Sequence, residues 1–157
     1  MPRDRRKVVR REIPPDWRYG SVLVQRFINK INYRGKKTIA EKIVYKAFEE
    51  IKKRTNKDPV KVFTEAVENV RPLVIVRPRR VGGATYQVPI EVPKYQGESI
   101  SMRWIIQFAR LRKGKPMYLK LTEELLEAAN KQGNAVKKRE DTHKMAEANK
   151  VFLHYRW

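Results

Sequence analysis

Arginine and glycine residues near the middle of the chain have the types and spacing that bind phosphate. Arg77, Arg79 and Arg80 directly precede the segment Val81-Gly82-Gly83-Ala84. A guanidinium group binds phosphate through two parallel hydrogen bonds and also stacks on bases. Because the segment 77–84 contains no acidic residue, we favour nucleic-acid contact. The alternative is that these charges only protect an exposed strand edge from aggregation.

A second basic segment, at residues 35–38, places two lysines where a helix is expected to begin. It superficially resembles a phosphate-binding loop, but Lys30 stands where that motif needs its first glycine, and Lys37 where it needs serine or threonine. The segment therefore does not predict nucleotide hydrolysis. The free N–H groups and the dipole of a helix N-terminus favour an anion. Lys36 and Lys37 at that place predict contact with RNA phosphates.

Three more basic clusters are candidates for RNA contact. Lys137, Lys138 and Arg139 fall in the expected first turn of another helix, where they again predict an anionic partner, although Glu140 and Asp141 weaken the prediction. Residues 1–18 predict either a basic arm that orders on its partner or a solubilising tail. A cluster at the end of the expected fourth helix is ambiguous, because cations are favourable at any helix C-terminus. The arm contains Arg3, Arg5, Arg6, Lys7, Arg10 and Arg11, and the fourth-helix cluster contains Arg110, Arg112, Lys113 and Lys115.

The chain lacks the groupings of residues that catalysis or metal binding requires. It has two histidines, His143 and His154, and no cysteine. Neither histidine has a second imidazole or a thiol at ligand spacing. The acidic residues lie mostly at the spacing of surface ion pairs on helices, as Glu49 does with Lys53. We therefore expect no enzyme, no metal site and no cofactor, with His143 in packing or in a polar network.

The composition favours a polyanionic partner. The 157 residues include 37 Lys and Arg against 17 Asp and Glu, which gives a formal net charge of +20 and a pI near 10.4. Such a charge destabilises a compact fold unless a polyanion neutralises it. Nucleic acid is the first candidate and an anionic membrane surface the second. Hydrophobic residues make up 41% of the chain, which is enough for a core, and no secretory signal or membrane span is visible, so we expect a cytoplasmic protein.

Apolar periodicity and turn residues predict a mainly α fold: a six-helix domain with a protruding two-stranded antiparallel β-hairpin arm. The hairpin is expected at 72–93 with Gly82 and Gly83 at its tip. Pro78 and Pro89 lack an N–H group, so each must occupy a position that faces away from the partner strand. The expected helices begin at Ser21, at a capping box from Thr38 to Glu41, at Pro59, at Ser99, before Leu121 and at Ala135. The resulting division is a basic arm at 1–18, a helical RNA-binding domain at 19–151 and an aromatic tail at 152–157.

Several blocks in one order resemble the family of bacterial small-subunit ribosomal protein seven along nearly the whole chain. Departures include Gln96-Gly97, which replaces an arginine pair common before the fourth helix. The matching blocks are Phe27-Ile28-Asn29-Lys30, Gly35-Lys36-Lys37, residues 40–45, residues 79–89, Arg103-Trp104, residues 137–150 and His154-Tyr155-Arg156-Trp157.

This resemblance implies a protein that binds directly to the 3′ domain of small-subunit rRNA and nucleates assembly of the subunit head. It also implies a place at the subunit interface, with the hairpin tip near exit-site tRNA and mRNA, and contact with small-subunit proteins nine and eleven. We expect no membrane partner and no homo-oligomer. Tyr155, Arg156 and Trp157 are expected to dock on a protein or on RNA. The resemblance and the charge pattern together give these candidate RNA-binding residues: Arg3, Arg5, Arg6, Lys7, Arg10, Arg11, Lys30, Arg34, Lys36, Lys37, Arg77, Arg79, Arg80, Arg110, Arg112, Lys113, Lys115, Met117, Lys137, Lys138, Arg139 and Lys144.

One alternative of a different class stays open from the residues alone. A β-ribbon arm with basic residues also suits an architectural protein that bends duplex DNA. The two functions differ in their preferred nucleic acid: folded rRNA or generic duplex.

Overall fold

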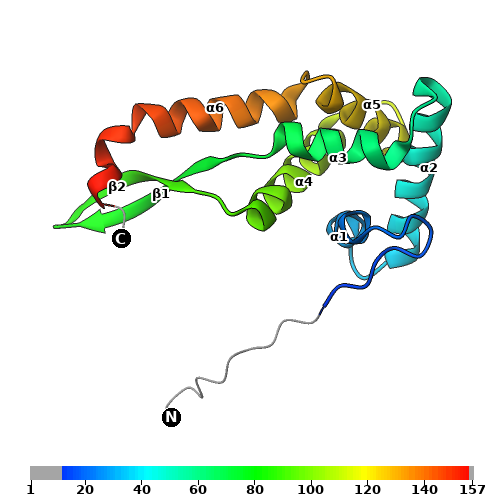
Figure 1. Cartoon of the computed structure of the whole chain (residues 1–157), viewed down its shortest axis with the longest axis horizontal. Helices are drawn as coiled ribbons and strands as arrows, with labels where there is room; N and C mark the ends of the chain where they lie inside the picture. Colours follow the sequence, from blue (N-terminus) through cyan, green and yellow to red (C-terminus); the bar gives the residue numbers. More distant parts are fainter. Residues whose placement is uncertain (1–11, 156–157) are drawn as a thin grey trace, which may run out of the picture.

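A computed structural model describes residues 12–155 of the chain. Within that range the protein is mainly helical, with one two-stranded sheet between the third and fourth helices (Figure 1). The predicted fold class is confirmed. The elements are α1 (Val22–Ile31), α2 (Lys37–Thr55), α3 (Pro59–Val70), β1 (Val74–Val81), β2 (Ala84–Glu91), α4 (Lys94–Leu111), α5 (Met117–Ala129), α6 (Asn134–Ala148) and the 3-10 helix η1 (Lys150–Tyr155).

The core lies where α1 to α5 pack together. Phe27, Phe48 and Phe63 are fully buried, and their ring centroids lie 4.8 Å apart for Phe27 and Phe63 and 5.5 Å apart for Phe48 and Phe63. Each ring comes from a different helix, so this cluster ties α1, α2 and α3 into one body. Two apolar helix residues lie outside this core, because Ile39 on α2 is 51% exposed and Leu111 on α4 is 66% exposed.

Two predicted helix starts are corrected by the structure. The Thr38–Glu41 capping box is absent, because left-handed backbone at Arg34 and Gly35 lets α2 begin two residues earlier, with Lys36 rather than Thr38 as its N-cap. Helix α4 begins at Lys94 rather than Ser99. Gly97 lies inside α4, where a Cβ would come within 2.8 Å of the Arg71 side chain. This glycine therefore permits a close approach of two segments and does not break the helix.

The hairpin has the expected tip and the expected proline positions. Gly82 and Gly83 both have positive φ, at +55° and +87°, as a tight two-residue turn requires. Val92 N–H donates to the Leu73 carbonyl at 2.8 Å, so hydrogen-bonded pairs fall at odd-numbered positions of β1. Pro78 pairs with Gln87, and Pro89 pairs with Val76. Both prolines therefore occupy non-hydrogen-bonded positions, as predicted.

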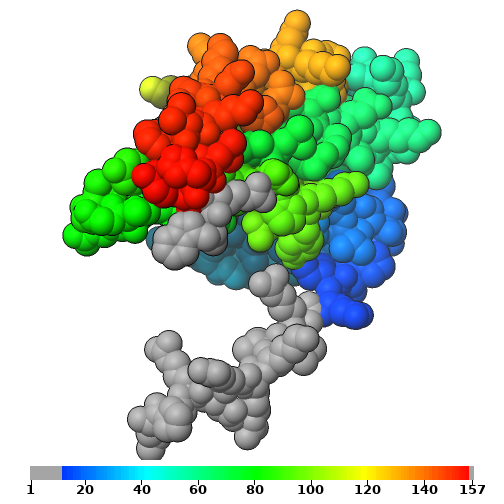
Figure 2. Space-filling model, turned by 60° about the vertical axis from the view of Figure 1, so that its left-hand side comes forward, coloured from blue at the N-terminus to red at the C-terminus, as the bar shows by residue number. Residues whose placement is uncertain are grey.

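The hairpin extends beyond the helical body, but one side of it is covered. Helix α6 runs along it and the chain then turns into η1, which lies against β2 (Figure 1). A view from another side shows the same contact, with η1 in red on the green hairpin (Figure 2). The Tyr86 ring lies 5.3 Å from Phe152 and 4.9 Å from Tyr155. The arm is therefore supported by the C-terminal part of the fold.

Candidate nucleic-acid interface

The loop before α2 presents its lysines to solvent. Lys36 is the N-cap of α2 and forms no side-chain capping hydrogen bond, and Lys37 is the first residue of the helix. Both side chains are exposed. Lys37 Nζ lies 3.7 Å from Glu41 Oε1, one turn further on, while no carboxylate within residues 12–155 pairs with Lys36. The helix start thus has free N–H groups and an unneutralised cation, a combination that favours a bound anion.

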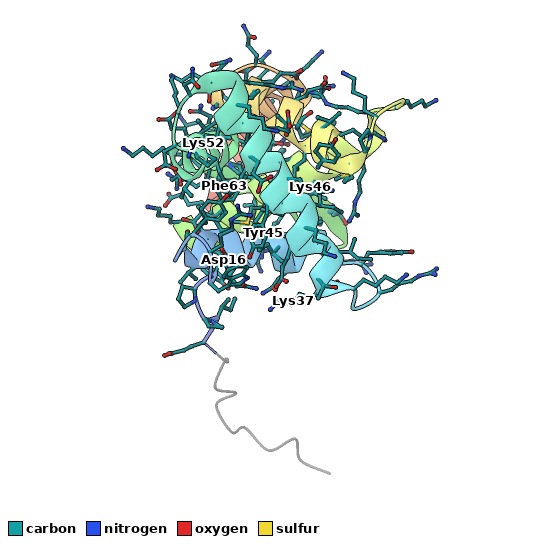
Figure 3. The ribbon with its side chains drawn as sticks, turned by 90° about the vertical axis from the view of Figure 1, so that its right-hand side faces the viewer. Asp16, Lys37, Tyr45, Lys46, Lys52 and Phe63 are labelled. Carbon is teal, nitrogen blue, oxygen red and sulfur yellow. The ribbon has the colours of Figure 1, made fainter. Side chains whose placement is uncertain are left out.

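Figure 3 shows α2 from outside, with Lys37, Lys46 and Lys52 spaced along it from beginning to end. The same view places Asp16 beside Tyr45. The Tyr45 hydroxyl donates to Asp16 Oδ1 at 2.6 Å, and Asp16 is 1% exposed. Burial, and then this hydrogen bond, raise the pKa of the Tyr45 hydroxyl. The segment that directly precedes α1 is thereby fixed to α2.

The hairpin arginines lie on both faces of the arm. Arg77 and Arg79 pair with Val88 and Tyr86 on one face, and Arg80 pairs with Thr85 on the other. All three arginines are exposed. Exposed cations therefore stand on both faces of the ribbon near its tip.

The fourth-helix cluster does not behave as one site. Arg112 donates to Glu124 Oε2 from two of its nitrogens, at 3.0 and 2.7 Å, to Glu127 Oε2 at 2.6 Å and to Glu123 Oε2 at 3.5 Å. The bonds to Glu127 and Glu124 raise the pKa of this guanidinium, against the effect of burial. Arg112 therefore holds α5 to the end of α4. Lys115 pairs with Glu123 at 2.5 Å, and Lys113 is exposed.

The carboxylates of Glu124 and Glu127 also lie close to the beginning of α6. Gly133 is its N-cap, with φ +90°, and a Cβ there would lie 2.8 Å from Glu127 Oε2. Burial raises the pKa of the Glu124 carboxyl, while Arg112 and the backbone N–H of Ala135 act in the opposite direction. The protein itself thus supplies the negative charge that this helix start favours. A phosphate is not required to balance this helix start, and RNA contact at Lys137–Arg139 stays a prediction.

The cations of α6 also separate into two kinds. The helix begins at Asn134, so Lys138 and Arg139 lie beyond its first turn. Arg139 Nη1 donates to the Asn69 carbonyl at 2.5 Å, which fixes α6 to the end of α3. Lys137, Lys138 and Lys144 are exposed. The exposed lysines keep their predicted role as candidates, whereas Arg139 has a packing role inside the fold.

The remaining predicted residues lie at the edges of the body. Lys30 is half-buried in the last turn of α1, Arg34 is exposed, and the half-buried Met117 packs against the core at the start of α5. The half-buried Tyr155 ring packs on Tyr86. Outside the described residues lie Arg3, Arg5, Arg6, Lys7, Arg10, Arg11, Arg156 and Trp157.

Sequence reasoning missed Arg103, which lies beside Lys30 and Arg110 along the contact between α1 and α4. These three residues line one hollow. Arg103 and Arg110 are seven residues apart, with Gln107 between them, so Arg103, Gln107 and Arg110 share one face of α4. That spacing in the sequence could have revealed the group.

Among the described residues, no group of three acidic, histidine or cysteine side chains could hold a metal ion. None of the helices in residues 12–155 combines the length and apolar character that a bilayer crossing requires. Together with the exposed cations, the fold defines a basic, mainly helical protein with a β-hairpin arm.

Comparison with known proteins identifies the family. The sequence model of the family described as Ribosomal protein S7p/S5e matches residues 2–150. The chain is 60% identical over 153 residues to the small ribosomal subunit protein uS7 of Thermotoga neapolitana, covering 98% of this chain and 99% of the relative. It is 60% identical over 157 residues to the uS7 protein of Dictyoglomus thermophilum, with full coverage of both. The chain therefore belongs to the ribosomal protein S7p/S5e family, whose members are structural proteins and not enzymes.

Proposed function

We propose that this protein binds directly to the 3′ domain of small-subunit rRNA, nucleates assembly of the subunit head and lies at the subunit interface. The coarser role follows from family membership: it is a structural protein of the small ribosomal subunit and part of the cytoplasmic ribosome. The hairpin tip is proposed to lie near exit-site tRNA and mRNA. Small-subunit proteins nine and eleven are the proposed protein partners, and no homo-oligomer is proposed.

One observation carries the proposal: exposed cations without acidic partners stand on separate elements. Within residues 12–155, Lys36 before α2, Arg80 on β1 and Lys138 on α6 are exposed, and no carboxylate pairs with them. A protein that reads a duplex groove concentrates such residues on one helix or strand. Cations spread over a loop, an arm and a helix suit a folded RNA recognised by its shape and backbone.

The proposed RNA-contacting set follows from this distribution. Arg112 and Arg139 are assigned to packing within the fold, and Met117 stays a proposal from family resemblance. The division into an arm at 1–18, a body at 19–151 and a tail at 152–157 also stays a proposal. The RNA-contacting residues proposed within the described range are Lys30, Arg34, Lys36, Lys37, Arg77, Arg79, Arg80, Arg110, Lys113, Lys115, Lys137, Lys138 and Lys144.

A competition experiment tests the proposed function. The full chain is bound to a labelled 3′-domain rRNA fragment and challenged at one salt concentration with three competitors: the same fragment, another rRNA domain of equal length and duplex DNA. We expect the 3′ domain to compete best, because shape recognition adds to the charge attraction that all three share. Equal competition by duplex DNA would contradict the proposal and favour the architectural DNA-binding alternative.

A further inference from the structure

The hairpin arm joins the helical body through two short connections, and Leu73 lies at the base of both. Residues 71–73 link α3 to β1, and residues 92–93 link β2 to α4. The Leu73 carbonyl accepts from the Val92 N–H at 2.8 Å, while the Leu73 N–H donates to His143 Nε2 at 3.0 Å. This residue therefore ties the two connections to each other and to α6.

The chain just before Leu73 is fixed to the end of α3. The Arg71 N–H donates to the Glu68 carbonyl at 3.1 Å, and its guanidinium donates to both carboxylate oxygens of Glu68. Pro72, which follows, is buried, and its ring restricts φ. A change in the angle of the arm therefore falls on Leu73 and the residues next to it.

The contact between α6 and the hairpin contains a hollow beside this hydrogen bond. Helix α6 runs along the hairpin (Figure 1), and the hollow between them has a volume of about 360 Å³. The His143 ring lines it, together with apolar side chains of the hairpin, α6 and η1: Val74, Pro89, Ala146 and Leu153. Close packing would hold the ring in one place, whereas a hollow of this size leaves it room to turn.

Charged groups face the His143 ring from α6, β2 and η1. Burial, and then the charge of Arg139 one turn earlier on α6, lower the pKa of the imidazole. Glu147, one turn later on α6, Glu91 on β2 and Lys150 on η1 line the same hollow as the ring. The two carboxylates favour an imidazolium there, whereas Arg139 and Lys150 oppose it.

Protonation of His143 is incompatible with its hydrogen bond to Leu73. Nε2 accepts from the Leu73 N–H only while it carries no proton, and both nitrogens of an imidazolium are donors. A proton taken up from solvent would therefore set two N–H groups against each other. The charged ring can donate to Glu147 or Glu91 instead, and the Leu73 N–H is then left to water.

From this geometry we propose that His143 is a pH-sensitive latch for the hairpin arm: the neutral ring holds Leu73, and the protonated ring releases it and pairs with a carboxylate of the hollow. Release lets the base of β1 move relative to α6. The arm bears Arg77, Arg79 and Arg80, so its angle sets the distance between these cations and those of the body. The latch operates in the free protein, so its test is independent of the proposed function.

Amide hydrogen exchange of the full chain, followed by NMR and corrected for the intrinsic effect of pH, tests the latch itself. Between pH 7.5 and 5 the protection of the Leu73 amide should fall about two- to tenfold, the weight of one hydrogen bond. The fall should begin near the usual imidazole pKa of about 6.5, because the released ring takes up its proton there. His143→Gln, whose Oε1 can accept in place of Nε2 without titrating, should keep the protection at both pH values, and His143→Ala should lack it at both.

Single-molecule FRET tests whether release moves the arm. The chain contains no cysteine, so Thr85→Cys near the hairpin tip and Lys137→Cys near the start of α6 take the two dyes specifically. Both positions are exposed. We expect the distance distribution to shift or broaden between pH 7.5 and 5. With His143→Gln added it should stay as at pH 7.5, and with His143→Ala added it should resemble the pH 5 distribution throughout.

Two results would overturn the latch: identical distance distributions at the two pH values, or a response of Leu73 that persists in His143→Gln. Glu91→Gln with Glu147→Gln should move the response to lower pH, because the imidazolium loses its partners, and an unmoved response would refute the role of these carboxylates. His154→Gln changes an exposed ring on η1 and is the matched control. A response lost in that variant would assign the switch to the other histidine. Circular dichroism and thermal melting at each pH verify that the helical fold is kept.

Discussion

At the scale of single residues, the main finding is that charge alone does not distinguish a nucleic-acid contact from an internal ion pair. Arg112 and Lys113 are neighbours in sequence, yet Arg112 binds three carboxylates while Lys113 is exposed. The difference arises from Glu124 on α5, which is 1% exposed and needs a cation in contact.

We predict that Arg112→Ala lowers the free energy of unfolding by about 3–5 kcal/mol, because it leaves the buried Glu124 carboxylate without its partner. Lys115→Ala removes an exposed pair with Glu123 and should cost less than about 1 kcal/mol. Urea denaturation of both variants measures the difference. Similar losses for the two would show that the Arg112 cluster is an ordinary surface feature.

His143 gives a second prediction at this scale. Leu73 N–H donates to His143 Nε2 at 3.0 Å, so this nitrogen must be unprotonated in the folded protein. Burial, and then the charge of Arg139, lower the pKa of the imidazole. The unfolded chain therefore takes up this proton first, at a pH near the usual value of about 6.5, and stability falls as pH decreases below that value.

Urea denaturation between pH 5 and 7.5 should show this loss in the native sequence. His143→Gln should remove that part of the pH dependence. His154→Gln, which changes an exposed ring, should leave it. An unchanged slope in His143→Gln would show that the Leu73 hydrogen bond is not linked to protonation.

At the scale of elements, the hairpin arm depends on η1 for support. Val88 and Pro89 are buried although they stand in a two-stranded ribbon, and Tyr86 packs against Phe152 and Tyr155. Isolated two-stranded hairpins are marginally stable in water, so this covering should help to hold the arm in one orientation.

Phe152→Ala should therefore loosen the arm. We expect a loss of about 0.5–1.5 kcal/mol from the aromatic contact beyond the buried area, together with faster hydrogen exchange of β2 amides. Val151→Ala alters the neighbouring side chain, which is 76% exposed, and serves as the control. Equal exchange in the two variants would mean that η1 does not stabilise the hairpin.

Sequence patterns predicted the elements better than their ends. The hairpin, its two-glycine tip and its outward prolines follow from local rules that depend on a few neighbouring residues. The start of α4 was missed, and Gly97 lies inside this helix, where the absence of a Cβ leaves room for the Arg71 side chain from a distant segment. The predicted capping box failed for a local reason, since left-handed backbone at Arg34 was not expected from the sequence.

In the candidate site too, features set by neighbouring residues could be predicted, whereas features set by contacts between distant segments could not. Exposure of Lys36 and of the hairpin arginines could be predicted, because each lies in a turn or on a narrow ribbon. The internal roles of Arg112 and Arg139 could not, since their partners Glu124 and Asn69 lie on other helices. The hollow lined by Lys30, Arg103 and Arg110 likewise requires α1 and α4 to be brought together by packing.

At the scale of the whole molecule, the charge of +20 is distributed over an arm, a loop and several helices. Part of that charge is neutralised within the fold, around Arg112 and Arg26. The rest is exposed on separate elements, and each cation that meets a phosphate releases counterions on binding. Affinity for RNA should therefore decrease steeply with salt, in proportion to the number of phosphates contacted.

The salt dependence of binding to the 3′-domain fragment tests this claim most directly. Lys36→Gln with Lys37→Gln should reduce the slope of log affinity against log salt by roughly 1.4–1.8, at about 0.7–0.9 for each phosphate that the variant no longer neutralises. Lys52→Gln with Lys57→Gln carries the same change in net charge at the far end of α2 and should leave the slope near that of the native protein. An unchanged slope in the Lys36 and Lys37 variant, or equal reductions in both variants, would contradict the proposal that Lys36 and Lys37 contact phosphates of the RNA.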